Sequence, residues 1–195
     1  LAVPSSNGRD GAIVIDSLEG LMTVTGAVSA HGHVRLHVTT GSLLANANIQ
    51  SVDKDISILV LRDITVTDGI DITTSSTGTI DIEALIGSIT LSTSSDLITG
   101  SGDVRLLAGI NITLGGYIST TGSVSATAVT GWIRDGDMDA GMDIYSFGLR
   151  LWSAIGVGQL GASVNPVETT SSVLSARVGT EGLNILETDQ LLIGD

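Results

Sequence analysis

Four aspartates occupy alternate positions in the stretch Asp135-x-Asp137-x-Asp139-x-Gly141-x-Asp143. Alternate carboxylates in a short loop can converge on one hard cation, and calcium prefers such oxygen ligands. Compared with the calcium loop of helix-loop-helix proteins, the glycine stands one position late and no glutamate closes the loop. The spacing predicts a calcium site formed by Asp135, Asp137, Asp139 and Asp143, with a solvated acidic turn as the alternative.

The three histidines of the chain, His31, His33 and His37, form a second cluster. Residues two apart on a strand share a face, so His33 and Arg35 should lie on one outward face. Zinc requires neutral imidazoles and a further ligand, and a guanidinium among them disfavours a cation. We therefore expect an exposed polar face rather than a metal site.

Asp81 and Glu83 are the pair that most resembles a catalytic one. Glycoside hydrolysis uses two carboxyl groups about 5–10 Å apart, and two outward positions on one strand come close to that distance. Outward strand positions are normally charged, however, and the chain has few aromatic residues to bind a sugar. We predict that the protein is not an enzyme, with a glycan-binding or glycan-cleaving β-helix as the alternative.

Trp152 is the aromatic residue that could contact a ligand. It stands between Leu151 and Ser153 in an alternating run, opposite the inward residues, and should be partly exposed. Packing beneath the loop around Asp135 or the loop around Gln159 is the expected role. Ligand contact is the alternative.

These residues are embedded in short runs whose apolar side chains recur at every second position. The clearest run extends over residues 78–91, where strict alternation places one set of side chains on the inner face of a strand. The inward set is Ile80, Ile82, Ala84, Ile89 and Leu91. Gly87 lies between the two runs, where the chain must bend and a side chain would be costly.

The unit recurs at a nearly constant interval. Ile80 is matched by Ile56 before it and Val104 after it, each 24 residues away (80 − 56 and 104 − 80). A fixed period with short strands and no helical pattern is typical of a solenoid. We predict an all-β fold, a parallel β-helix (β-solenoid) of about eight coils with roughly 20–25 residues each.

The periodicity extends along the whole chain, so residues 1–195 should form a single β-solenoid segment. Two irregular stretches, near 132–143 and 159–170, are expected to leave the rod as loops. The start at Leu1 and the absence of polar capping segments predict a segment of a longer array.

Composition limits the function classes. The formal net charge is −13, from 8 Lys and Arg against 21 Asp and Glu, and so acidic a surface should repel nucleic acids. No apolar run is long enough to insert into a membrane. Cysteine is absent, and 25 glycines accompany many Ser, Thr and β-branched residues, which is a composition of strands and turns.

The Gly-x-Ile-x-Ile-x-Ala and Gly-x-Ile-x-Leu pieces of residues 78–91 resemble the haemagglutinin-type repeats of filamentous-haemagglutinin-like exoproteins. The part from Trp132-Ile133-Arg134-Asp135-Gly136 to Leu186-Glu187-Thr188-Asp189 is similar to a segment of giant bacterial adhesin-like proteins. The resemblance implies a right-handed parallel β-helix and an elongated, non-enzymatic protein outside the cell or on the bacterial outer surface. It also implies a shaft or spacer role, with neighbouring coils or end-to-end copies as partners and a host-surface or glycan receptor as a further one.

Overall fold

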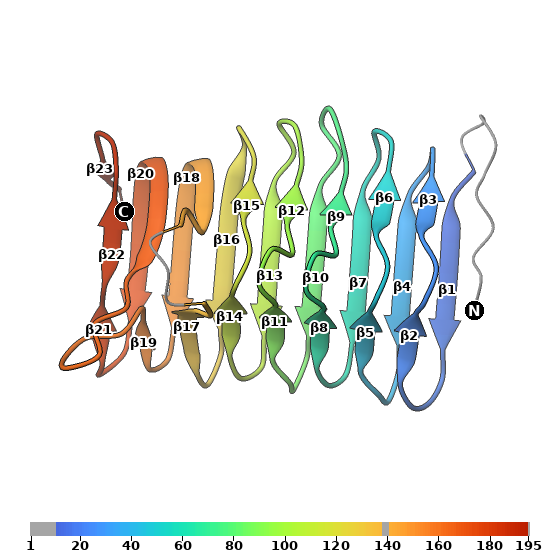
Figure 1. Cartoon of the computed structure of the whole chain (residues 1–195), viewed down its shortest axis with the longest axis horizontal. Helices are drawn as coiled ribbons and strands as arrows, with labels where there is room; N and C mark the ends of the chain where they lie inside the picture. Colours follow the sequence, from blue (N-terminus) through green and yellow to red (C-terminus); the bar gives the residue numbers. More distant parts are fainter. Residues whose placement is uncertain (1–10, 138–140, 195) are drawn as a thin grey trace.

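The computed structural model describes residues 11–137 and 141–194, and within them it contains strands and turns but no helix. The strands stack in parallel as a β-solenoid of about eight turns, which confirms the predicted all-β fold. Figure 1 shows the coils side by side along the rod, with the two chain termini at opposite ends. No described element is a helix that could cross a membrane.

Each regular coil contributes three strands, and each strand pairs with its equivalent in the next coil. The first ladder contains β1 (Ile13–Ser17), β4 (Val34–Val38), β7 (Ile56–Val60), β10 (Ile80–Ala84), β13 (Val104–Ala108) and β16 (Ser123–Ala128). The second contains β2 (Met22–Val24), β5 (Leu43–Ala45), β8 (Ile64–Val66), β11 (Ile89–Leu91), β14 (Ile112–Leu114), β17 (Trp132–Asp135), β19 (Gly156–Val157) and β21 (Gly182–Leu183). The third contains β3 (Val28–Ala30), β6 (Ile49–Ser51), β9 (Ile72–Thr73), β12 (Leu97–Ile98) and β15 (Ile118–Ser119).

Two long strands near the C-terminal end join the third ladder to the first. These are β18 (Ile144–Ser153) and β20 (Val167–Val178), which pair with each other along most of their length. β18 continues both β15 and β16, so that one strand belongs to both ladders. The short strands β22 (Ile185–Glu187) and β23 (Leu192–Ile193) pair with β20 and complete the described rod.

The register agrees with the period read from the sequence. Ile80 lies opposite Ile56 on one side and opposite Val104 on the other, as the 24-residue spacing predicts. The same register places Asp81 beside Arg105, and the two side chains form an ion pair. A parallel ladder in register puts identical strand positions one above the other.

The predicted inward residues form the core. Ile80, Ile82, Ala84, Ile89 and Leu91 are all fully buried, and their equivalents in other coils continue the stack. The core is built from β-branched and aliphatic side chains, as the low aromatic content of 3% implies. Burial of this kind is the main favourable contribution to folding, about 25 cal/mol per Å² of apolar surface.

The bend glycines are required for close approach between coils. A Cβ atom on Gly87 would lie 2.4 Å from the carbonyl carbon of Arg62 in the preceding coil, and one on Gly41 would lie 1.5 Å from the carbonyl oxygen of Gly20. Gly20 itself has a left-handed backbone, with φ of +78°. The glycines therefore fit the bends mainly because neighbouring backbones leave no room for a side chain.

Polar side chains at the three corners link each coil to the next. At each corner the residue before a strand accepts a hydrogen bond from the backbone N–H of the equivalent residue one coil later. Asp63 accepts from Ser88 at 2.9 Å, and Asp96 accepts from Tyr117 at 3.0 Å. Asp55 accepts from both the amide and the hydroxyl of Thr79. Burial alone would raise the pKa of Asp55, but these hydrogen bonds, with the nearby charges of His33 and Lys54, lower it. Many of the acidic residues thus have a structural role.

Buried hydroxyl groups satisfy backbone carbonyls where the third strand turns into the next coil. The Thr99 hydroxyl donates to the Gly78 carbonyl, and the Thr120 hydroxyl donates to the Gly102 carbonyl, each at 2.6 Å. Ser51 and Thr74 make the same kind of contact in earlier coils. These serines and threonines are as buried as the neighbouring core, and their hydrogen bonds remove the cost of burying a polar group.

Both predicted loops are shorter in the structure than the sequence suggested, because strands occupy part of each interval. The interval 132–143 begins with β17, which continues the second ladder as far as Asp135. The interval 159–170 ends inside β20, which begins at Val167. The alternating pattern of both strands was hidden by charged and polar residues at inward positions, such as Asp135 and Thr169, which are buried.

Replacing Ile82 by Asp should unfold the rod or lower its stability severely. The side chain of Ile82 is fully buried between Ile58 and Leu106 of the adjacent coils, so a carboxylate there would have no partner. The expected loss is roughly 4–5 kcal/mol or more, comparable with the whole stability of many domains. Thermal and denaturant melts followed by circular dichroism measure it.

Thr90→Asp is the matched control, because Thr90 faces outward between Thr65 and Thr113. This variant should melt within a few degrees of the parent. Equal melting of the Ile82→Asp variant and the parent would contradict the assigned register.

Candidate functional site

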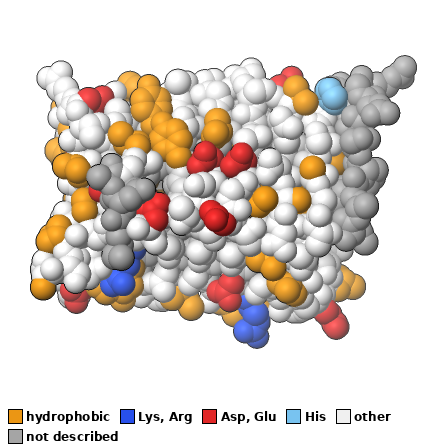
Figure 2. Space-filling model, in the orientation of Figure 1, with side chains coloured by type: hydrophobic (Ala, Val, Ile, Leu, Met, Phe, Trp, Pro, Cys, Tyr) orange, Lys and Arg blue, Asp and Glu red, His pale blue; other side chains and the backbone are white. Residues whose placement is uncertain are grey.

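Two regions near the C-terminal end of the rod carry grouped polar side chains. The first holds the aspartates predicted to bind calcium, between β17 and β18. Asp137 and Asp143 line a shallow depression together with Asp96 and Tyr117. Figure 2 shows several acidic side chains gathered on one face of the rod. Asp139 lies outside the described residues.

Asp135 does not line this depression but lies buried at the end of β17. Its Oδ1 atom accepts a hydrogen bond from the amide of Asp137 at 3.0 Å, while Oδ2 is buried without a hydrogen-bond partner among the described residues. The side chain of Asp135 is thus directed into the rod, while Asp137 and Asp143 line the depression. Asp96, which comes from two coils before Asp143, is the acidic member of the depression that the spacing could not reveal.

Asp143 and Glu168 occupy equivalent positions in consecutive coils, one residue before the inward position that starts the third ladder. Both are buried, and the Oδ2 atom of Asp143 accepts a hydrogen bond from the amide of Glu168 at 3.0 Å. Burial, together with the nearby charges of Asp135 and Glu168, raises the pKa of Asp143 to about 9. The carboxyl group of Asp143 is therefore protonated at neutral pH in the absence of a cation.

The calcium site stays a prediction. Among the described residues, no three Asp, Glu, His or Cys side chains are arranged to hold a metal ion. The two carboxyls that meet at the depression from the predicted set are those of Asp137 and Asp143. A buried carboxylate is costly unless its charge is neutralised, and in this cluster either a proton or a cation can do so.

His37 and the Asp81–Glu83 pair lie on the outward side of the first ladder, as predicted, while His31 and His33 are exposed just before β4. Arg35 forms an ion pair with Asp16 at 2.9 Å, and His37 contacts the same carboxylate at 3.3 Å. Arg105 binds both Asp81 and Glu83. In each case a cation in one coil is placed beside a carboxylate of the preceding coil, so these residues form ion pairs between coils.

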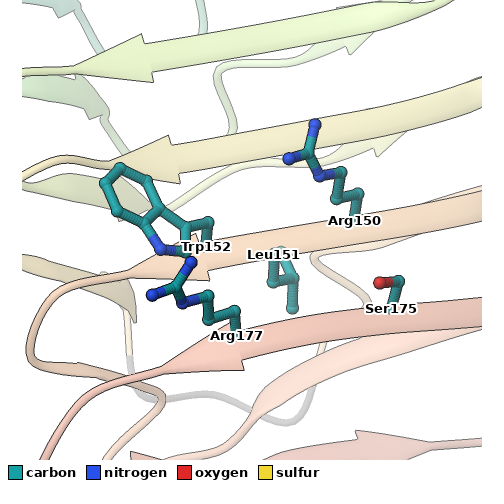
Figure 3. Close-up of a pocket in the computed structure, with 5 residues that line it drawn as sticks. All are labelled: Arg150, Leu151, Trp152, Ser175 and Arg177. Atoms are coloured by element: carbon teal, nitrogen blue, oxygen red, sulfur yellow. The ribbon is translucent and has the colours of Figure 1, made fainter. Parts of the chain in front are cut away.

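The second region is a depression of about 650 Å³ on the outward side of β18 and β20, lined by Arg150, Leu151, Trp152, Ser175 and Arg177. The ladder places Arg150 opposite Ser175 and Trp152 opposite Arg177. Figure 3 shows the guanidinium group of Arg177 beside the indole of Trp152, and the Arg150 side chain along the same strand.

A smaller depression of about 330 Å³ adjoins it and shares Arg150 and Ser175. Its lining includes Gly148, which has no side chain to fill the space, and the hydroxyl-bearing Ser123 and Ser125 of β16. We call the two depressions together the β18 groove. It follows β18 from Gly148 to Trp152, about 13 Å of strand.

The arginines of the β18 groove differ from the others on the same face. Arg35 and Arg105 are ion-paired, but Arg150 and Arg177 form no ion pair within the described residues. The register explains this difference: Ser125 and Ser175 flank Arg150, while Thr127 flanks Trp152 on the side away from Arg177. No carboxylate stands at the positions where the earlier coils place one.

Trp152 is half-buried and faces outward, as its place in the sequence predicts, but it lines the groove. No residue of the loops around Asp135 and Gln159 is among the lining. Trp152 was the candidate ligand-contacting residue that the sequence indicated, whereas Arg150, Ser175 and Arg177 were not predicted to lie beside it. Aligning Leu149 with Leu174 would have found them, because that step of 25 residues brings Arg150 beside Ser175.

Comparison of the chain with protein-family models, with curated proteins and with solved structures finds no match.

Stability should fall as the pH rises between about 4 and about 9. The pKa of Asp143 is raised from 3.8 to about 9, so over this range the folded chain keeps a proton that the unfolded chain releases. One such proton gives a slope of at most about 1.4 kcal/mol per pH unit. Replacing Asp143 by Asn should flatten the dependence and stabilise the protein at pH 8, measured by denaturant melts from pH 6 to pH 9 in chelator.

Asp81→Asn is the control, since Asp81 is an exposed ion-pair partner and its loss should cost under ~1 kcal/mol without changing the slope. Parallel curves for the parent and the Asp143→Asn variant would contradict the raised pKa.

Calcium should raise the melting temperature if the loop binds it. A site with a dissociation constant of ~10⁻³ M would gain about 1.4 kcal/mol at 10 mM calcium. The Asp137→Asn, Asp139→Asn double variant should lose this gain, whereas Asp68→Asn, in an exposed turn, should keep it. Equal melts of all three proteins in calcium and in chelator, with no heat of binding, would exclude the site.

Proposed function

We propose that the chain is a shaft or spacer segment of a secreted bacterial surface adhesin or extracellular filament. The observation that carries the proposal is the continuity of the three ladders. Backbone hydrogen bonds run from coil to coil along the rod, from β1 to the long strands β18 and β20. A rod of this kind holds two regions of a protein at a set distance, because each coil adds one rung of about 4.8 Å.

The surface chemistry supports a location outside the cell. A net charge of −13 favours solubility and discourages contact with nucleic acid and anionic membranes. Stability rests on backbone ladders, ion pairs between coils and the aliphatic core, without any cysteine. These properties fit the filamentous-haemagglutinin-like exoproteins that the repeats resemble, and we extend that family's role to this chain as part of the proposal.

The partners proposed for the shaft are further coils of the same kind or end-to-end copies. The strand β23 leaves Leu192 and Ile193 65% and 69% exposed at one end of the described rod. Ile193 stands in register with the buried Leu174. A further rung in the same register would cover these side chains and pair the open strand edge.

A catalytic role is not proposed. Asp81 and Glu83 both form ion pairs with Arg105 on the outward face of the sheet, and neither residue lines the β18 groove. A glycan-binding role is compatible with a shaft, because the β18 groove involves only β16, β18 and β20 and leaves the other coils unchanged.

The test is the location of the protein in its native cells. Antibodies against the purified chain should label intact cells. Electron microscopy of the labelled protein should show the antibodies bound along a thread-like region. A cytosolic enzyme serves as the control for cell integrity. Labelling that appears only after the cells are made permeable, or release of reducing sugar from polysaccharides by the purified chain, would contradict the proposal.

A further inference from the structure

The β18 groove combines two cations, an indole and a row of hydroxyl groups on a surface that is otherwise acidic. We propose that it binds a saccharide carrying a carboxylate, with Arg150 and Arg177 as the anion-binding residues and Trp152 as the platform for a sugar ring. The proposal goes beyond the shaft function and does not depend on it, because binding is a property of the purified chain.

The two guanidinium groups define the anion site. Arg150 and Arg177 lie on adjacent strands and two positions apart in register, so they are diagonal neighbours on the same face. Such neighbours have backbones about 7–8 Å apart, within reach of long side chains. A guanidinium group offers parallel N–H donors that match the two oxygens of a carboxylate. Within the described residues both arginines lack an acidic partner, so their donors are available to a ligand.

The remaining lining suits a sugar. Trp152 is half-buried, so its position is fixed while part of its indole stays exposed beside Arg177 (Figure 3). Sugar rings carry both apolar C–H faces and hydroxyl groups, and an indole with nearby serines offers a matching surface. Ser125 and Ser175 flank Arg150, where their hydroxyls can donate to or accept from sugar hydroxyls. Gly148 keeps the far end of the groove open.

The charge of the whole molecule limits the ligand to a short one. A long polyanion lying along the same face would pass Asp81 and Glu83 of β10, and the net charge of −13 would repel it. A uronic acid or sialic acid residue at the end of a short glycan supplies one carboxylate for the guanidinium donors and a sugar ring for the indole. A neutral glycan would leave the arginines unused.

The experiment is isothermal titration calorimetry of the purified chain with two pairs of probes. The first pair is trigalacturonate and its fully methyl-esterified form, and the second is sialyllactose and its methyl ester. Each pair separates the carboxylate from the sugar rings, and the two pairs distinguish a uronic acid source from a sialic acid source. We expect saturable binding of at least one carboxylated probe and about tenfold weaker binding, or none, of its neutral counterpart.

Variants assign the binding to the groove. Arg150→Gln and Arg177→Gln should each weaken binding by about tenfold, and Trp152→Ala should weaken both charged and neutral probes. Arg105→Gln is the matched control, because Arg105 has the same outward strand position but is ion-paired with Asp81 and Glu83, and it should bind as the parent does. Arg150→Lys, which keeps the charge without the fork, should fall between Arg150→Gln and the parent. Circular dichroism confirms that each variant is folded.

Several outcomes would overturn the proposal. One is the absence of binding of both carboxylated probes at millimolar concentration. Another is equal binding of charged and neutral members of each pair, and a third is binding that Arg150→Gln and Arg177→Gln leave unchanged. Equal losses in Arg105→Gln and Arg150→Gln would show a general charge effect and would also contradict a site in the groove.

Discussion

The structure depends on the in-register hydrogen bonding of each coil's backbone to the next. Because the ladders are parallel, a residue's nearest neighbour on the sheet is the residue at the same position one coil later. Isoleucine therefore stacks on isoleucine in the core, and a bend glycine stacks on the carbonyl group of the preceding coil. The same constraint turns the corner aspartates into acceptors for the next coil, so most of the polar sequence follows from the stacking.

The constraint also determines how charge is distributed. In a stacked ladder, like charges at one position would repel each other, and the first ladder avoids this by placing a cation beside a carboxylate of the neighbouring coil. Arg35 with Asp16 and Arg105 with Asp81 follow that rule. This pattern does not continue at β18 and β20. There the neighbours of Arg150 are Ser125 and Ser175, and no acid stands beside it in register. Among the described residues, Arg150 and Arg177 on this face therefore have no acidic partner, which distinguishes the groove from the ion-paired positions of the earlier coils.

The sequence was most informative where the signal is local. Alternation over five residues identifies the inward face, and the repeat of 24 residues aligns Ile56, Ile80 and Val104, so the core and the Asp81–Arg105 pair could be predicted. The site residues were harder to group, because they come together only after the coils are aligned across irregular stretches. Asp96 comes from two coils before Asp143 and lines the same depression, and Glu168 follows Asp143 after 25 residues. Spacing within one loop cannot reveal such neighbours, and the right-handed winding stays a prediction from the family resemblance.

At one corner of the rod, the acids that stack from coil to coil become buried. At the same corner of earlier coils, Asp71 and Asp96 are partly exposed, and each accepts a hydrogen bond from the backbone amide of the equivalent residue in the next coil. Asp143 keeps that hydrogen bond but is buried, with Asp135 and Glu168 as its nearby charges. An ionised carboxylate there would be unstable without a counterion, so the cluster must take up either protons or a cation. A calcium ion at the predicted site would have to displace that proton, which costs more free energy at pH 6 than at pH 8, so we expect a stabilising effect of calcium to be larger at pH 8.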